Sequence, residues 1–177
     1  MMNKIVAVVV ACLAFIVPAS GQSLGERTGV SAIIGVAPST TDFLSEATIV
    51  DIFGIEAGKL ALARGGDKSK SFAEKAVKEH EDSSLALKAL IAGGNVRATL
   101  PTAIDSSRQG ILDKLAKLQG ADFDKEYSDS QASAQAGALS LFARYAKGGD
   151  HPDLQLFAVK RLPNLEERAR LAKDLKS

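Results

Sequence analysis

The stretch SFAEKAVKEHEDSSLALKALIAG, residues 71–93, decides the fold that the sequence predicts. Small and apolar residues recur in it at spacings of three and four, which places them on one face of a helix. That face comprises Ala76, His80, Ser83, Leu87 and Leu90, flanked by Phe72, Ala73, Val77, Ser84 and Ile91. Charged residues cover the opposite face. The stretch therefore predicts a long amphipathic helix with a histidine, His80, on its apolar side.

The composition predicts an all-α protein of one domain. The 177 residues include no tryptophan and 5% aromatic residues, while the abundant alanine and leucine favour helices. The chain carries 22 basic and 21 acidic residues. Residues 1–21 contain one charged residue, Lys4, so their removal leaves 21 against 21. This balance predicts no surface for nucleic acid, and nothing in the sequence indicates an oligomer or a particular protein partner.

Residues 1–21 have the pattern of a signal peptide. Lys4 precedes an apolar run over residues 5–17, and Pro18 is followed by the small residues Ala19-Ser20-Gly21. The run is shorter than the ~20 residues of a membrane-spanning helix. We expect cleavage after Gly21, or alternatively after Ala19, and a periplasmic protein without a transmembrane anchor.

The single cysteine, Cys12, offers an alternative, because residues 9–12 match a lipoprotein cleavage box in residue type. Few residues precede Cys12, which disfavours that interpretation. After cleavage at the signal peptide the chain would contain no cysteine, and so no disulfide, thiol nucleophile or thiolate metal ligand. Residues 22–38, rich in glycine and small polar residues, predict a flexible or loosely docked leader. Residues 39–177 then form the helical domain.

The first helix of that domain is expected from a cap at Ser39 or Thr41 to about Arg64. It has two apolar stripes. One holds Glu56 among Ile49, Ile52, Phe53, Leu60 and Ala63, and the other consists mainly of small residues, Phe43, Ala47, Val50, Gly54, Ala57 and Ala61. The first stripe predicts that the Glu56 carboxylate is buried. In the following turn, residues 65–67, we expect a left-handed glycine and capping of the next helix by Asp67.

Further helices follow residues 71–93. After a loop over 95–104, a capping box at Ser106 and Gln109 predicts a short helix that ends at Gly120. Residues 121–147 predict a long helix with Gln131 and Gln135 as polar insertions. Residues 148–150 repeat the earlier Gly-Gly-Asp turn before a last helix, in which Pro163 predicts a kink near Lys160. Two helical hairpins joined by a crossover that contains a short helix are the layout of a ferritin-like four-helix bundle.

His80 and Glu56 are the candidate metal ligands. Di-iron bundles combine glutamates with Glu-x-x-His motifs, but the residue three before His80 is Val77. A hydrogen-bonded core histidine is the alternative, and a buried carboxylate is most often paired. We expect His151 to be an exposed residue at a helix start. The sequence shows no phosphate-binding glycine loop and no serine nucleophile with a base, so it predicts neither a catalytic residue nor a cofactor.

Several short segments, in their order and spacing, carry a resemblance over residues 38 to about 175. They are PSTTDF (38–43), AGKLA (57–61), KEH (78–80), LPT (100–102), LDKL (112–115), LFARYAKGGD (141–150) and LPNLE (162–166). The chain resembles an exported bacterial ferritin-like family that is catalogued as a domain of unknown function (number four-one-four-two) and is often labelled an outer-membrane protein. The resemblance implies a periplasmic helical bundle of undefined activity.

The family typically has histidines at several positions facing the bundle, and this chain departs from that pattern. Gln135 stands where the resemblance places a second Asp-His, and Arg168 and Arg108 replace two further histidines. The candidate polar core site is therefore Glu56, His80, Gln131, Gln135 and Arg168.

Two hypotheses follow for the function. The first is a non-enzymatic exported protein whose former site survives as a hydrogen-bonded network. Arg168 would then neutralise Glu56, unless it reaches solvent and pairs with a surface acid. The second is a metal-binding or redox-active protein that uses Glu56 and His80.

Overall fold

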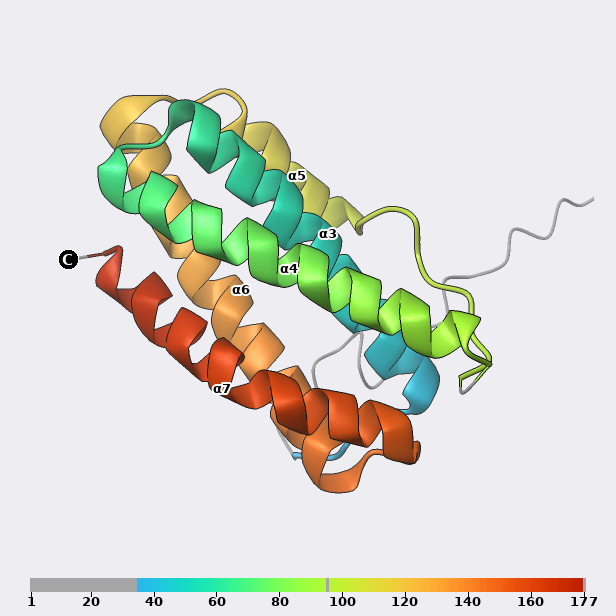
Figure 1. Ribbon diagram of the computed structural model, residues 1–177. Coiled ribbons are helices and arrows are strands. Elements are labelled where there is room, and N and C mark those ends of the chain that lie inside the picture. The colour runs from blue at the N-terminus through green and yellow to red at the C-terminus, as the bar shows by residue number, and fades with distance from the viewer. Residues whose placement is uncertain (1–34, 95, 177) are drawn as a thin grey trace, which may run out of the picture.

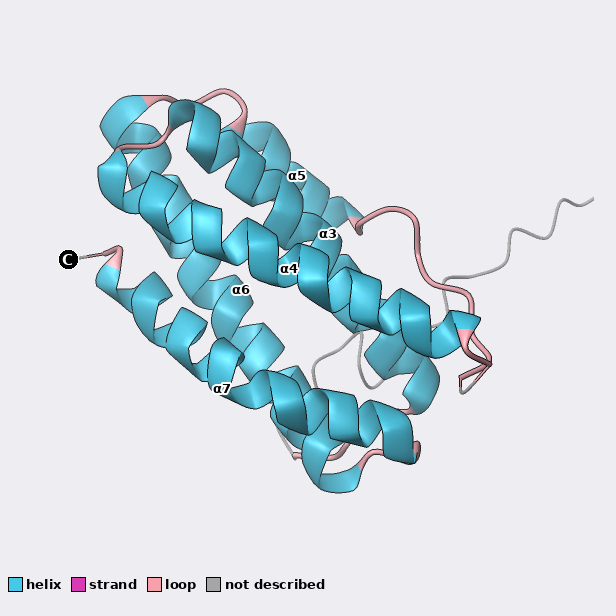
Figure 2. Ribbon diagram, viewed as in Figure 1, coloured by secondary structure: helices cyan, strands magenta, loops and turns pink. Residues whose placement is uncertain are grey.

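The computed structural model describes residues 35–94 and 96–176, which fold into five helices without a strand (Figure 2). The helices are α3 (Thr40–Arg64), α4 (Asp67–Ala92), α5 (Ser106–Leu115), α6 (Gly120–Gly148) and α7 (Pro152–Asp174). The all-α prediction is confirmed for this part of the chain. The expected signal peptide, residues 1–21, and most of the leader, residues 22–38, lie outside the described residues.

The long helices form two hairpins, α3 with α4 and α6 with α7, and the short α5 lies on the connection between them (Figure 1). α3 also packs on α6, and the two run in opposite directions. At one end Thr40 Oγ1 lies 2.8 Å from the Tyr145 hydroxyl. At the other end Arg64 donates a hydrogen bond of 3.3 Å to the Leu118 carbonyl, just before α6.

The start of α3 agrees with the sequence prediction, whereas the turn after it does not. Ser39 caps α3, and its Oγ accepts from the Asp42 N–H at 3.1 Å. Gly65 and Gly66 are extended, with φ of −77° and −75°, so the predicted left-handed glycine is wrong. Asp67 is the first residue of α4 rather than its cap.

A residue from a distant helix caps α4 instead. The carboxylate of Asp124, on α6, accepts from the Gly66 N–H at 2.9 Å and from the Ser69 hydroxyl at 2.6 Å. Glycine is required at position 65 because a Cβ there would lie 2.8 Å from the Ala61 carbonyl oxygen. The turn is thus shaped by close approach and by a long-range acceptor.

The other boundaries lie within about one residue of their predictions, except the C-terminal end of the short helix. The cap of α5 is Asp105, whose carboxylate accepts from the Arg108 N–H at 2.9 Å, so the predicted capping box at Ser106 is wrong by one position. α5 ends at Leu115, before the predicted Gly120. α7 continues as one helix through Pro163. The kink expected near Lys160 stays a prediction.

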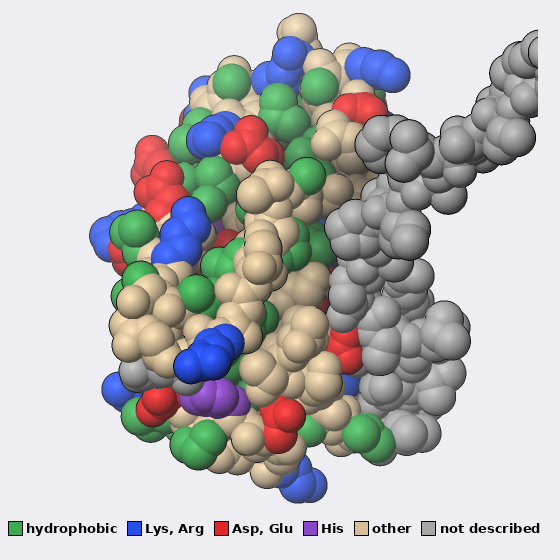
Figure 3. Space-filling model, turned by 90° about the vertical axis from the view of Figure 1, so that its right-hand side faces the viewer, with side chains coloured by type: hydrophobic (Ala, Val, Ile, Leu, Met, Phe, Trp, Pro, Cys, Tyr) green, Lys and Arg blue, Asp and Glu red, His purple; other side chains and the backbone are tan. Residues whose placement is uncertain are grey.

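The surface shows no dominant charge on the face drawn in Figure 3. Basic and acidic side chains are interspersed there, with hydrophobic side chains between them. Within residues 35–94 and 96–176, no helix combines the length and the apolar character that crossing a membrane requires.

In the part of the chain that the structure describes, the hydrophobic core consists of two separate clusters, one at each end of the long helices. The first includes Phe43, Leu44, Leu87, Phe142, Tyr145 and Leu154. The second includes Phe53, Phe72, Leu115, Phe123, Tyr127 and Ala172. All four long helices contribute to both clusters, so each helix passes from one to the other at an intermediate level.

Candidate functional site

A layer of buried polar side chains occupies that intermediate level, and we call it the polar layer. Its members come from all four long helices: Asp51 on α3, His80 on α4, Gln131 and Gln135 on α6, and Arg168 on α7. Each is flanked along its own helix by residues of the two hydrophobic clusters. The polar layer therefore lies between the two hydrophobic clusters.

His80 and Asp51 form the first half of the polar layer. His80 Nδ1 lies 2.9 Å from Asp51 Oδ1, and the two side chains are 1% and 4% exposed. An ionised carboxylate only accepts, so Nδ1 carries the shared proton and Nε2 is left as an acceptor. Burial lowers the pKa of His80, the hydrogen bond to Asp51 opposes this, and the nearby Arg168 guanidinium lowers the pKa further. His80 is therefore neutral near pH 7.

The absence of a side chain at Gly54 makes room for the imidazole. A Cβ built on Gly54 would lie 2.3 Å from both His80 Nε2 and His80 Cδ2. One turn further along, a Cβ on Gly58 would lie 2.3 Å from a methyl group of Val77. The small residues of α3 thus let α4 approach closely, which presses the His80 ring against the α3 backbone.

Arg168 organises the second half of the polar layer. Its Nε donates to Gln135 Oε1 at 2.9 Å, and one terminal nitrogen donates to Glu79 Oε2 at 3.1 Å. Gln135 in turn donates to Gln131 Oε1 at 3.2 Å. The Arg168 side chain is 7% exposed. Burial lowers its pKa, while Glu79 and Asp51 raise it, and a guanidinium stays charged at any ordinary pH.

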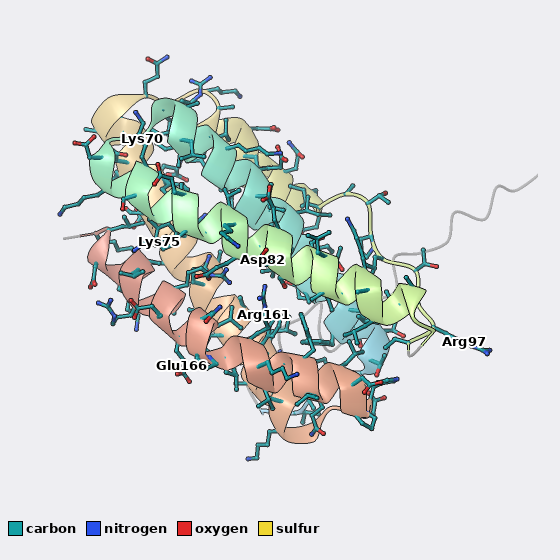
Figure 4. All side chains as sticks on the ribbon, viewed as in Figure 1. Lys70, Lys75, Asp82, Arg97, Arg161 and Glu166 are labelled. Atoms are coloured by element: carbon teal, nitrogen blue, oxygen red, sulfur yellow. The ribbon has the colours of Figure 1, made fainter. Side chains whose placement is uncertain are left out.

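A second arginine joins α7 to α4 at the same place. Arg161 donates from one terminal nitrogen to the Glu79 carbonyl at 2.6 Å, and Figure 4 shows it lying between the two helices. Glu79 therefore receives hydrogen bonds from two arginines of α7, one at its backbone and one at its side chain.

Four of the five candidate residues meet in the polar layer, and Glu56 does not. The Glu56 side chain is 48% exposed and pairs with Lys59 Nζ at 2.8 Å. The predicted burial of Glu56 and its pairing with Arg168 are wrong. The reason is the orientation of α3, which turns its small-residue stripe inward and leaves the stripe of Glu56 at the edge, where Ala63 is exposed and Leu60 half-buried.

Sequence reasoning missed Asp51 and Glu79. Asp51 lies four residues after Ala47 and three before Gly54, on the small-residue stripe itself, so its helical position carried the signal. Glu79 belongs to the charged residues that the pattern places away from the apolar face, because it points about a third of a turn away from His80. Its 30% exposed side chain reaches Arg168 from the boundary, and the sequence held no sign of that partner.

Arg108, which the resemblance in the sequence places at a second histidine position, lies outside the polar layer. It pairs with Asp105 at 2.5 Å and with Glu46. His151 is the N-cap residue of α7, as its expected place at a helix start requires, but it is half-buried, so the predicted exposure is wrong. Neither residue therefore extends the site.

The donor set of the polar layer does not suit a metal ion. No group of three His, Cys, Asp or Glu side chains with metal-binding geometry occurs among residues 35–94 and 96–176. His80 has one carboxylate partner, Asp51, and it is bonded through Nδ1. The cation that balances Asp51 and Glu79 is Arg168, whose guanidinium would repel an ion bound beside it.

The polar layer is also closed to a substrate. Each of its five members, taken as a whole residue, is at most 6% exposed. The large groove between α3, α5 and α6, of about 790 Å³, is lined by none of them. A buried histidine–carboxylate pair can hold or move a proton, but acid–base catalysis also needs a reactant within hydrogen-bonding distance.

Comparison with protein families places the chain in one of them. The model of the family described as "Domain of unknown function (DUF4142)" matches residues 26–175. Neither the curated proteins nor the solved structures gave a significant match.

Proposed function

The chain belongs to the DUF4142 family, and we propose that it is an exported periplasmic protein with a structural or interaction role rather than an enzyme. The observation that carries this proposal is the position of Arg168. Its guanidinium lies in the core, bonded to Gln135 and Glu79, at the level where a ferritin-like protein would hold metal ions. In this proposal the guanidinium of Arg168 takes the place of an exchangeable metal ion. The polar side chains of the former metal site then serve to hold the helices together.

The architecture that we propose is a ferritin-like four-helix bundle. Two antiparallel hairpins are joined by a long connection that contains α5, and this connectivity is one that such bundles use. The polar layer lies halfway along the long helices, where side chains from facing helices build metal sites in ferritin-like proteins.

The test of the non-metal role is the metal content of the protein from its own periplasm, purified without a histidine tag. We expect no stoichiometric transition metal, because His80 is the one imidazole in the polar layer and its best-placed carboxylate already accepts from it. One or two tightly held iron, zinc or manganese ions per chain, by elemental analysis, would overturn the proposal. The metal-binding hypothesis would then take its place.

Export has its own test, since the signal lies in residues 1–21. We expect the intact mass of the periplasmic form to correspond to a chain that begins at Gln22 or at Ser20. Retention of Met1, or an acylated Cys12 at the N-terminus, would contradict it. This measurement is independent of the metal analysis, so each part of the proposal can fail alone.

A further inference from the structure

We infer that the groove between α3, α5 and α6 is the docking site of the chain's own leader, residues 28–34. α3 contributes Ile49 and Phe53 to the groove, the crossover contributes Ile104 and Ile111, and α6 contributes a row that ends at Arg144. No residue of the polar layer lines the groove. The inference therefore does not depend on the proposed function.

The α6 side of the groove suits a polypeptide backbone. Its row consists mostly of small residues: Ser130, Ser133, Ala134, Gly137, Ala138, Ser140 and Leu141. A Cβ built on Gly137 would meet nothing within 4 Å. Serine hydroxyls can bond peptide groups, and short side chains leave room for a main chain beside the helix.

The chain itself leads into the groove. The Val36 carbonyl accepts from an Arg144 terminal nitrogen at 2.8 Å, and Arg144 is also a lining residue. The Ala37 methyl group lies 3.3 Å from the position of a Cβ on Gly148. Residues 36 and 37 are thus fixed against the C-terminal end of α6, and the family match begins ten residues earlier, at residue 26.

The length and the composition of residues 28–34 match those of the groove. Ser130 to Arg144 spans 14 residues of α6, or ~21 Å at the helical rise. Seven extended residues, 28–34, span ~23 Å. The segment TGVSAII carries no charge, so it can be buried without the cost of desolvating one. Alternation in an extended chain would direct Val30, Ala32 and Ile34 toward Ile49 and Phe53.

Cysteine cross-linking in the full chain tests this inference, in a Cys12→Ala background that leaves no other thiol. One variant pairs Ser31→Cys with Gly137→Cys, in the groove, because alternation would direct residue 31 toward α6. Its matched control pairs Ser31→Cys with Ala136→Cys, an exposed neighbour on α6 that does not line the groove. Mild oxidation is followed by mass spectrometry and by gel mobility without reductant.

A docked leader should cross-link within one chain at position 137 at least ~10-fold faster than at position 136. A merely tethered leader would reach both positions at a similar effective concentration, so equal rates would overturn the inference. Disulfide-linked dimers through position 137 would also overturn it, because they would identify a second copy of the chain as the occupant.

Discussion

At the scale of single residues, the site depends on a side chain that is absent. His80 reaches Asp51 only because position 54 carries no Cβ, and the ring occupies the space where one would be. Helix propensity alone would count this glycine as destabilising α3 by up to ~1 kcal/mol. Its role is to leave space for the imidazole of His80.

We expect Gly54→Ala to destabilise the protein by about 1–3 kcal/mol, because the new methyl group overlaps the imidazole and α3 is too tightly packed to yield. Urea unfolding followed by circular dichroism measures the change. Gly110→Ala, within α5 and outside the lining of the groove, is the control, since a Cβ there meets nothing within 4 Å. That variant should be stabilised by ~0.5–1 kcal/mol through helix propensity. A neutral Gly54→Ala would show that His80 can adopt another position at no cost.

At the scale of helices, α4 and α7 are joined by polar contacts around Glu79, whereas α3 with α4 and α6 with α7 pack intimately. Arg168 bridges further, from Glu79 on α4 to Gln135 on α6. The guanidinium therefore ties one hairpin to the other.

A double-mutant cycle measures this tie. We expect Arg168→Ala and Glu79→Gln to couple by ~1–2 kcal/mol, within the range for contacting residues in one network, because the guanidinium is buried although Glu79 is 30% exposed. Arg168→Ala with Glu56→Gln serves as the control, and its coupling should be near zero because Glu56 pairs with Lys59. If the two cycles gave the same coupling, Arg168 would not be held by Glu79.

The cap of α4 provides a second prediction at this scale. Asp124→Ala should destabilise the protein by about 1–2 kcal/mol, because the Gly66 N–H and the Ser69 hydroxyl lose their acceptor. Asp113→Ala, which removes an exposed acceptor of Gln109, should change the stability by less than ~0.5 kcal/mol. Thermal unfolding of both variants measures the two changes in stability. Equal losses of stability would mean that Asp124 does not act as a cap.

At the scale of the whole molecule, the stability should depend on the protonation of His80. The pKa of His80 is lower in the folded protein than in the unfolded chain. As the pH falls, His80 is therefore protonated in the unfolded chain before it is protonated in the folded protein. Stability is fully present above the unfolded pKa of about 6.5 and is lost as the pH falls below it, toward the folded pKa. The slope is at most ~1.4 kcal/mol per pH unit for one proton.

Urea unfolding of the wild type and of His80→Gln between pH 7.5 and 5.5 tests this dependence. The window lies above the usual range of surface carboxylates. We expect the wild type to lose stability across it and the variant to show a flatter profile. Parallel profiles would mean that the pKa of His80 is the same in the folded and the unfolded chain, contrary to the lowering expected from its burial.

Much of the fold could be predicted from the sequence, because caps and helical periodicity are local. Ser39 caps α3 as the sequence predicts, and α4 buries the face that its periodicity predicts to be apolar. The failures concern partners that are distant along the chain. The choice between Glu56 and Asp51 depends on which stripe of α3 meets α4, and the cap from Asp124 depends on how α6 meets the first turn. Periodicity defines the faces of a helix, but tertiary packing decides which neighbour each face meets.

The division of the core by a polar layer also governs which alternative packings are open to the chain. Sliding one long helix by a turn, ~5.4 Å, would preserve most apolar contacts in a uniform core of alanine and leucine. Here such a slip would carry Asp51, His80 or Arg168 into an apolar cluster and strand a charge or a ring without its partner. Stranding one member of a buried ion pair typically costs ~3–5 kcal/mol. The polar layer thus fixes the position of each long helix along its neighbours and holds the helices in a single register.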